Sequence, residues 1–371
     1  MEVLILGGTG VMGSYLVNLL IDNKDSVYVT SRRDMNSKFE NLTYILGDAH
    51  DELFLDSVLS KRWDVIVDFM YYSTPEFKFR SEKLLKNTKQ YIYISSARVY
   101  AEYDGLIEET SPRLIDIIKD EKFLNSNEYS LKKARQEDIL SNSKFKNWTI
   151  IRPYITYGDE RLQLHTLEKE DWLFRALNNK SSTLSQEVNQ KVTTLTHGYD
   201  VARGIFSLLG RTEAFGEAFH ITHNDTILWS DVLEVYHDVL KEHNYDLKVK
   251  VKPLNHFYHW HRFRYQILND RLYDRKFNNR KIEQFIDTST FINPRDGLRN
   301  SLVLFLEERD FKNINLKNEA AEDGLFNVYN SLINIDSKKI KLKYALFFIS
   351  YKCRNLIGFI HSKFSNFKKY L

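Results

Sequence analysis

Tyr129 and Lys133 are four residues apart, a spacing that places a phenol and an ammonium on one face of a helix. A tyrosine with an unperturbed pKa near ~10 is a poor base at neutral pH, but a neighbouring positive charge favours its phenolate. The pair could therefore move a proton to or from a substrate hydroxyl. Because the chain has 22 tyrosines, this spacing is a weak signal without supporting residues.

Two serines give that support. Ser95 and Ser96 directly follow residues 91–94, an apolar and aromatic run that is typical of a buried strand. Ligands of open α/β sheets bind at the carboxyl edge, where such a strand ends. Ser96 could donate a hydrogen bond to a substrate oxygen while Tyr129 gives or takes its proton. The alternative role for both serines is turn formation after the strand.

The N-terminus has the glycine spacing of a dinucleotide-binding turn. A short apolar run leads into Gly7, Gly10 and Gly13. The first glycine permits a tight turn, the second lets the backbone approach a pyrophosphate, and the third lets helix and strand pack closely. Val11 and Met12 would open the helix, where free amides and the helix dipole favour phosphate. We expect a nicotinamide dinucleotide to bind here.

The residues after the second and third predicted strands bear on the choice of cofactor. Arg32 and Arg33 follow the second strand, where an NAD-specific site usually places an acid. Guanidinium groups could pair with a 2′-phosphate, which favours NADP. In the alternative, NAD binds, the arginines are solvated and Asp34 reaches the ribose. Asp48, after the third strand, could accept from the adenine amino group or serve as an ordinary helix cap.

The elements that must position these residues alternate between strands and helices. Helix-period segments at 11–21 and 128–140 lie between β-branched and aromatic runs, a pattern of βαβ units that predicts a Rossmann-type doubly wound parallel sheet in an α/β protein. The predicted strands are 2–6, 26–30, 42–46, 64–69, 90–95 and 148–152. Later helices are expected at 162–179, 201–209 and 229–242.

These elements predict a two-part organisation. We expect a cofactor-binding domain over residues 1–160, with later strands contributed by about 190–222, and a smaller C-terminal substrate lobe over 161–336. Residues 337–371 form a separate basic segment. No internal repeat or Gly/Ser/Pro linker divides the chain further.

The last segment combines charge with apolar residues. Residues 337–371 contain nine Lys and Arg and no Asp or Glu, interleaved with Phe, Leu and Ile. A basic amphipathic helix can lie in an anionic membrane interface, which makes this segment a candidate peripheral contact with the inner face of a membrane. A terminal helix packed on the body, or on a second subunit of a homodimer, is an equal alternative.

Composition narrows the class of protein. With 371 residues and 43% hydrophobic content the chain can bury a large core. Its 53 basic and 50 acidic side chains nearly balance, so we expect no DNA partner. Cys353, the sole cysteine, excludes an internal disulfide and fits a reducing compartment. The first residues lack signal-peptide features and the apolar run 344–351 is too short to cross a bilayer, so a cytoplasmic protein is expected.

Taken in order, these motifs resemble an extended short-chain dehydrogenase/reductase of the NAD-dependent epimerase/dehydratase family. The resemblance implies that Ser96 polarises the substrate oxygen, that Tyr129 is the general acid/base, and that Lys133 lowers the pKa of the tyrosine and binds the nicotinamide ribose. It also implies a nucleotide-activated sugar as substrate. It rests on Gly7-Gly8-Thr9-Gly10-x-x-Gly13, Ser95-Ser96-x-x-Val99-Tyr100, Tyr129-x-x-x-Lys133 and Arg152-Pro153-x-x-x-Tyr157-Gly158, with later support from residues 196–202 and 216–221.

Two departures from the family pattern matter. Ala97 and Arg98 follow Ser96, where the family's dehydratases place an acid, which argues against 4,6-dehydration. Asp159 stands where proline is usual, so the substrate loop is expected to differ. The primary hypothesis is therefore a keto-reductase or 4-epimerase of surface-polysaccharide biosynthesis. The alternative is a non-catalytic scaffold of the same fold that senses NADP(H) or binds RNA.

One remaining region is rich in histidine and arginine. His256, His259 and His261 lack a nearby cysteine or acid, so an aromatic packing cluster is expected there and no metal site. Four arginines further on could include a pyrophosphate clamp, although a solvated basic face is the simpler interpretation. They are Arg262, Arg264, Arg271 and Arg275.

Overall fold

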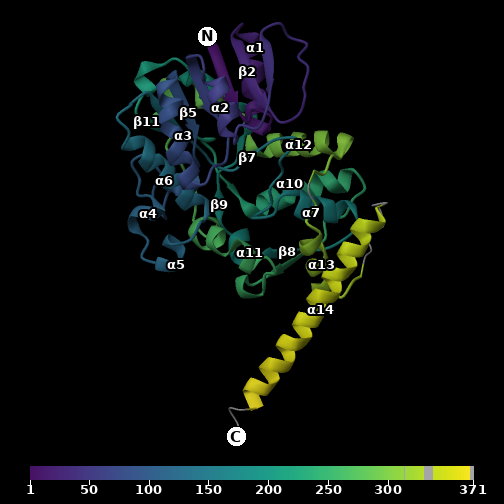
Figure 1. The fold of residues 1–371 in the computed structure, drawn as a ribbon. Coiled ribbons are helices and arrows are strands. Elements are labelled where there is room, and N and C mark those ends of the chain that lie inside the picture. The colour runs from purple at the N-terminus through teal and green to yellow at the C-terminus, as the bar shows by residue number, and fades with distance from the viewer. Residues whose placement is uncertain (313, 330–336, 368–371) are drawn as a thin grey trace.

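A seven-stranded parallel sheet forms the centre of the protein (Figure 1). The computed structural model describes residues 1–312, 314–329 and 337–367, with side chains up to residue 353. The strand order is β11-β6-β5-β4-β1-β2-β3, which confirms the predicted Rossmann-type doubly wound α/β fold. The strands are β1 (Glu2–Leu6), β2 (Ser26–Ser31), β3 (Leu42–Leu46), β4 (Trp63–Asp68), β5 (Thr88–Ile94), β6 (Trp148–Pro153) and β11 (Glu217–Ile221).

Helices cover both faces of this sheet. Along β1, Val3 and Ile5 pack under α1 (Val11–Asp22) and α9 (Gly198–Leu208), whereas Leu4 and Leu6 belong to a second core on the other face. That second core is completed by α2 (Glu52–Val58), α3 (Thr74–Lys86) and α6 (Tyr129–Ser141). Because successive strand residues point to opposite faces, an apolar run buries both sets of side chains. The near-continuous apolar character of the predicted strands follows from this.

Local capping fixes where the helices on the sheet begin. Ser73 and Glu76 form a reciprocal capping box at the start of α3, and the Asp51 carboxylate accepts from the Phe54 amide at the start of α2. The helices predicted at 11–21, 128–140, 201–209 and 229–242 are all present, as α1, α6, α9 and α10 (Trp229–Glu242). Their ends agree with the sequence to within a few residues.

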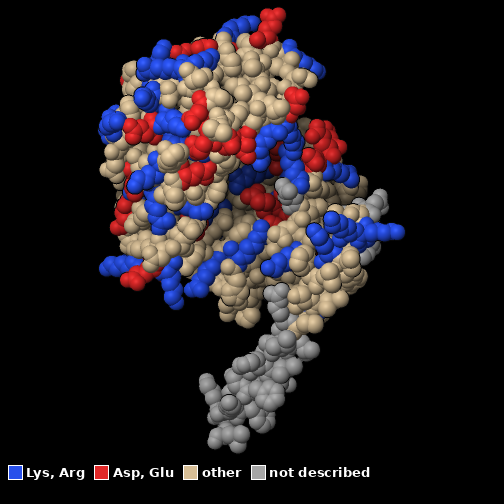
Figure 2. Space-filling model, in the orientation of Figure 1, with Lys and Arg blue, Asp and Glu red and all other residues tan. Residues whose placement is uncertain are grey.

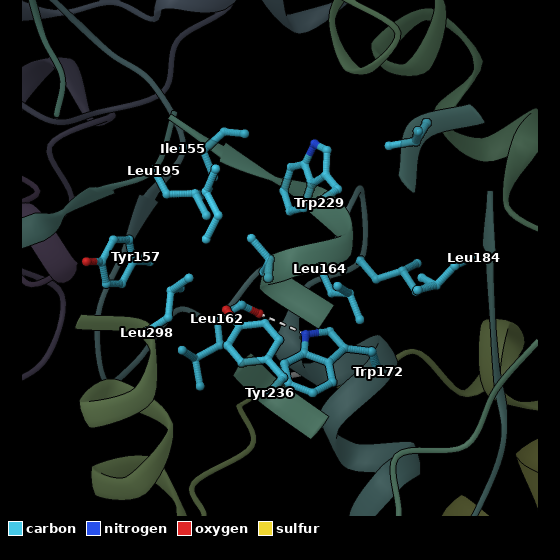
Figure 3. Close-up of a cluster of buried hydrophobic side chains, with 14 of the residues drawn as sticks. Ile155, Tyr157, Leu162, Leu164, Trp172, Leu184, Leu195, Trp229, Tyr236 and Leu298 are labelled. Atoms are coloured by element: carbon cyan, nitrogen blue, oxygen red, sulfur yellow. Dashed lines mark hydrogen bonds between the residues drawn. The ribbon is translucent and has the colours of Figure 1, made fainter. Parts of the chain in front are cut away.

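One predicted helix is partly wrong. Residues 162–179 were expected to be helical, but α7 spans only Lys169–Leu177. Before it, Leu164 and Leu167 form an isolated bridge, and His165 has a positive φ of 56°. Leu162 is buried, and its carbonyl accepts a hydrogen bond from the Trp172 indole (Figure 3). The apolar residues here anchor an irregular loop in the core.

The second half of the chain builds its own core beside the sheet. Trp172 of α7 and Tyr236 of α10 stack with ring centroids 4.5 Å apart, and Leu298 of α12 (Pro294–Glu308) lies near them (Figure 3). This half of the chain also contains three small two-stranded sheets. They pair β7 (Thr156–Tyr157) with β10 (Thr196–His197), β8 (Ser182–Ser185) with β13 (Val249–Lys252), and β9 (Val192–Thr193) with β12 (Ile227–Leu228).

The described chain ends in two packed helices. α13 (Leu316–Leu325) contacts α14 (Lys338–Phe367), and α14 then extends away from the body (Figure 1). In the part of the chain that the structure describes, no helix is both long enough and apolar enough to span a bilayer. The remaining short elements are α4 (Leu114–Ile117), α5 (Glu121–Leu124), α8 (Gln186–Asn189), α11 (Trp260–Gln266), η1 (Ala97–Val99), η2 (Thr212–Ala214), η3 (Leu254–His256), η4 (Ile267–Arg271), η5 (Ile282–Gln284) and η6 (Thr288–Thr290).

Candidate active site

The glycine turn connects β1 to α1 as its spacing predicts. Gly7 has a φ of +72°, a left-handed conformation that glycine adopts without strain. A Cβ on Gly13 would lie 2.5 Å from the Gly8 carbonyl oxygen, so only glycine fits that contact. A Cβ on Gly10 would meet nothing within 4 Å. The helix therefore packs tightly on the turn at Gly13, while the space beside Gly10, just before Val11 and Met12, is open, and no described side chain caps the helix there.

An open cleft of about 590 Å³ lies at the carboxyl edge of the sheet beside this turn. Gly7, Arg32, Arg33 and Asp48 line it, as expected from the ends of β1, β2 and β3. Asp34 is not among the lining residues. The carboxylate of Asp48 accepts from the His50 amide at 2.9 Å, and the cap of α2 is Asp51 instead. The alternative of Asp48 as that helix's cap is therefore wrong.

Ser96 and Tyr129 line a second cavity, of about 410 Å³. Ser96 follows β5 and caps the short helix η1, with its hydroxyl accepting from the Arg98 amide at 3.2 Å. Tyr129 is the first residue of α6, and its ring lies parallel to that of Tyr71, with centroids 5.9 Å apart. Met12 from the start of α1 also lines this cavity. The structure thus brings the predicted serine and tyrosine together next to the glycine turn.

Charge around Tyr129 acts in two directions. Burial raises the pKa of its phenol above the ordinary tyrosine value, and the guanidinium groups of Arg98 and Arg161, together with hydrogen bonding with Ser96, offset only part of that rise. The centre of the Arg98 guanidinium lies 5.2 Å from the centroid of the Tyr129 ring. Sequence analysis assigned this role to Lys133. In the structure Arg98 and Arg161 are the cations with the largest effect on the pKa of Tyr129.

Lys133 lies one helical turn further along α6, in a buried position. Its ammonium donates to the Ile94 carbonyl at 2.7 Å, at the end of β5. Burial lowers the pKa of Lys133 to about 8, and the carboxylates of Asp68 and Glu137 oppose that shift. Lys133 is therefore held at the same sheet edge as Ser96.

Arg98 is held in place from two sides. Its guanidinium pairs with Glu128 at 2.5 Å and lies 3.6 Å from Asp270. Asp270 also pairs with Arg271 and, at 3.1 Å, with Arg275. The contact with Asp270 joins the segment after β5 to η4, much later in the chain. The only sequence signal for Arg98 was its place directly after Ser96 and Ala97.

The interpretation of the later arginines as a solvated basic face is wrong for two of them. Arg271 and Arg275 are buried, and Arg275 donates to the carbonyls of Tyr100 and Ala101. Arg262 and Arg271 line the cavity that contains Tyr129. Arg264 is exposed.

The three histidines at 256, 259 and 261 do not lie in one common site. His259 is buried among the rings of Tyr258 and Phe263, as the expected aromatic cluster implies, and its Nε2 lies 3.4 Å from Glu322. His256 and His261 are exposed. Among the described residues no group of three His, Cys, Asp or Glu side chains is placed to hold a metal ion.

The model of the NAD dependent epimerase/dehydratase family matches residues 3–221, more than half of the chain. The chain belongs to this family. The match covers the glycine turn, Ser96, Tyr129 and Lys133. It ends at the last residue of β11, the final strand of the sheet.

Solved structures share the fold. The enzyme MoeE5 in complex with UDP-glucuronic acid and NAD is 15% identical, with a TM-score of 0.63 over 83% of this chain and 100% of its own. DesIV, a dTDP-glucose 4,6-dehydratase from Streptomyces venezuelae with NAD bound, is 20% identical, with a TM-score of 0.63 over 83% of this chain and 98% of its own. At these identities the likeness shows the fold alone.

Curated relatives are also similar over part of their length. A chloroplast stem-loop binding protein of 41 kDa from Arabidopsis thaliana is 28% identical over 236 residues, which is 60% of this chain and 58% of that protein. The chain covers 58% and 62% of the length of the two curated relatives it matches.

The structure shows where the two departures from the family's sequence pattern lie. Ala97 follows Ser96 directly, where the family's dehydratases place an acid, and the next residue, Arg98, lines the cavity beside Tyr129. Burial raises the pKa of the Tyr15 phenol to about 12, and the carboxylates of Asp159, which stands in place of proline, and Glu160 add to that rise. The residue after Asp159, Glu160, lines the cleft beside the glycine turn.

Proposed function

We propose that this protein is an NADP-dependent keto-reductase or 4-epimerase that acts on a nucleotide-activated sugar. The observation that carries the proposal is the shared cavity of Ser96 and Tyr129, which Met12 also lines at the glycine turn. A reacting carbon in that cavity would lie near both a proton donor and the start of the cofactor-binding helix. General acid/base groups must be within hydrogen-bond reach of the proton they transfer.

The cleft fits a dinucleotide. The open space over Gly10 and the start of α1, which no described side chain caps, suit a pyrophosphate, and the cleft has the size of small-molecule sites. When bound, the nicotinamide accepts or supplies the hydride. We propose that Lys133, at the end of β5, holds the nicotinamide ribose.

The chain's own residues manage the proton. Ser96 donates a hydrogen bond to the substrate oxygen and fixes its position. In reduction, Tyr129 gives its phenolic proton to that oxygen as the carbon gains hydride. In epimerisation, the Tyr129 phenolate first takes the hydroxyl proton as the carbon loses hydride, and returns it when hydride comes back on the other face of the sugar. Arg98 and Arg161 stabilise the phenolate in both reactions.

The preference for NADP rests on the end of β2. Arg32 and Arg33 are exposed in the cleft, and the acid of an NAD-specific site is missing from this position. Guanidinium pairs with phosphate are strong and often bidentate. The solved neighbours named above contain NAD, so the cofactor must be measured for this chain.

A nucleotide sugar suits the second cavity. Arg262 and Arg271 line it, and a diphosphate would find cations there. MoeE5 was solved with UDP-glucuronic acid and with UDP-glucose. These observations support the substrate class and leave the sugar open.

The test is turnover of purified protein with UDP-, dTDP- and GDP-sugars, each with NADP⁺, NADPH, NAD⁺ or NADH. NADPH consumption with a 4-keto sugar supports the reductase, whereas interconversion of two sugars without net cofactor change supports the epimerase. We expect Tyr129→Phe to lower kcat by about 10²- to 10⁴-fold. Tyr103→Phe, which removes an exposed phenol outside both cavities, is the matched control. Equal activity in both variants would refute the proposal.

The stem-loop-binding relative supports a second candidate, a non-catalytic scaffold that binds RNA or senses NADP(H). The presence of Ser96, Tyr129 and Lys133 at one sheet edge favours the enzyme. A gel-shift assay with a stem-loop RNA, with and without NADPH, separates the two. Tight RNA binding combined with no turnover of any nucleotide sugar would establish the scaffold.

A further inference from the structure

One face of α14 is packed against the body. Tyr344 is fully buried, and its hydroxyl donates to Asp323 of α13 at 2.6 Å. Ile340 and Phe348, four residues before and after it, join the same small core, which also contains Phe174 of α7. The first half of α14 therefore has a fixed orientation on the substrate lobe.

The opposite face carries an apolar stripe that is exposed to solvent. Leu342, Leu346 and Ile349 are 63%, 58% and 58% exposed, and Cys353 follows them. Their spacings of four, three and four residues place all four on one face of a helix. Single exposed apolar residues are common, but an aligned series of them marks an interaction site. The sequence continues the same spacing with apolar residues at 356, 360, 364 and 367.

The stripe is flanked by positive charge. Lys338, Lys339 and Lys343 are exposed at the start of the helix. Figure 2 shows blue side chains gathered where α14 begins, whereas blue and red are mixed over the rest of that face. The absence of any Asp or Glu from residues 337–371 in the sequence leaves these charges uncompensated within the segment.

We propose that α14 docks this protein on an anionic lipid surface, with the stripe of Leu342, Leu346, Ile349 and Cys353 at the acyl boundary and the lysines at the headgroups. Of the two alternatives left by the sequence, packing on the body accounts only for the Tyr344 face. A helix that combines an apolar stripe with flanking lysines matches the two layers of an anionic membrane interface. The helix would lie on the membrane.

Two other occupants fit the stripe less well. A second copy of the chain would bring two sets of lysines together, because the segment has no acids to pair with them. RNA would satisfy the lysines but leave the aliphatic side chains in water, since bases stack on aromatic side chains. Lipid satisfies the charge and the apolar surface together.

The sole cysteine of the chain provides the assay. Full-length protein is labelled at Cys353 with an environment-sensitive fluorophore and mixed with vesicles of phosphatidylcholine, alone or with phosphatidylserine. We expect a blue shift and co-sedimentation with the anionic vesicles alone, both weakened by salt. Lys338→Gln, Lys339→Gln and Lys343→Gln should each lower partitioning by about fivefold.

Leu346→Glu combined with Ile349→Glu should lower vesicle binding at least about tenfold. The matched control is Leu53→Glu with Phe79→Glu, which places the same charges on exposed apolar residues of α2 and α3. Unchanged binding by the stripe variant overturns the proposal. Binding that is equal with neutral vesicles also overturns it, as does a blue shift without vesicles that grows with protein concentration, which would indicate a second copy. The readout does not depend on enzyme activity, so it stands or falls separately from the proposed reaction.

Discussion

Lys133 should make the protein more stable as the pH rises above about 8. The side chain is buried and its ammonium has a pKa of about 8, against 10.5 for an ordinary lysine. Because the folded-state pKa is the lower one, the folded protein binds fewer protons than the unfolded chain between these two values. The free energy of unfolding therefore increases with pH in this window.

The size of the effect follows from the two pKa values. Each pH unit is worth about 1.4 kcal/mol, so charging Lys133 in the folded state costs about 3 kcal/mol relative to the unfolded chain. The whole of that cost is present below pH 8 and disappears above the unfolded pKa. Between about pH 7 and about pH 9.5 the contribution of Lys133 should rise by about 2 kcal/mol.

Urea unfolding at several pH values measures this contribution. The wild type should gain about 2 kcal/mol over Lys133→Met between about pH 7 and about pH 9.5. The buried tyrosines titrate in both proteins, so their effect on the free energy of unfolding cancels when the two proteins are compared. Lys132→Met, at the neighbouring position, where the ammonium bonds the exposed Tyr71 hydroxyl, is the control and should follow the wild type. Parallel stability curves for wild type and Lys133→Met would refute the reasoning.

Three further changes test other parts of the site. Gly13→Ala places a Cβ 2.5 Å from the Gly8 carbonyl oxygen, so we expect a loss of about 1–3 kcal/mol in urea unfolding together with loss of cofactor binding by calorimetry. Arg32→Ala should weaken NADPH binding about tenfold and leave NADH binding unchanged, as measured by fluorescence titration. Arg98→Met removes a cation that lowers the pKa of Tyr129, so the limb of the kcat profile that reports Tyr129, the basic limb in reduction and the acidic limb in epimerisation, should move to higher pH while the protein stays folded.

Local sequence patterns were sufficient for the sheet and its cofactor turn. The strands are apolar on both faces because helices cover both sides, and that requirement is visible within each short run. The glycine spacing is equally local, since the contact of Gly13 with Gly8 lies within one turn. The prediction of a helix over residues 162–168 was wrong because the apolar residues Leu162 and Leu164 suggested a buried helix face. In the structure they are buried in the same core as Trp172, but they lie in a loop that precedes the helix.

Ser96 and Tyr129 were recognisable because each follows a local signal, the end of a strand and the start of a helix. The surroundings of Tyr129 could not be read in this way. Arg98 is placed by Asp270, which also holds Arg271, and these residues meet only when the second half of the chain packs against the sheet. Charge next to the phenol is therefore a tertiary property of this site.

The position of Arg98 also bears on which reaction the site favours. Dehydration needs an acid that protonates a leaving hydroxyl, and a guanidinium cannot supply that proton because it stays protonated in proteins. The same cation, with its centre 5.2 Å from the Tyr129 ring centroid, favours the phenolate that removes a proton from a carbinol. Ser96 is thus followed by Ala97 and Arg98 and by no acid, and the positive charge of Arg98 makes the phenolate of Tyr129 easier to form. We expect the site to exchange hydride and proton at a single carbon and to leave the neighbouring carbon–oxygen bonds intact.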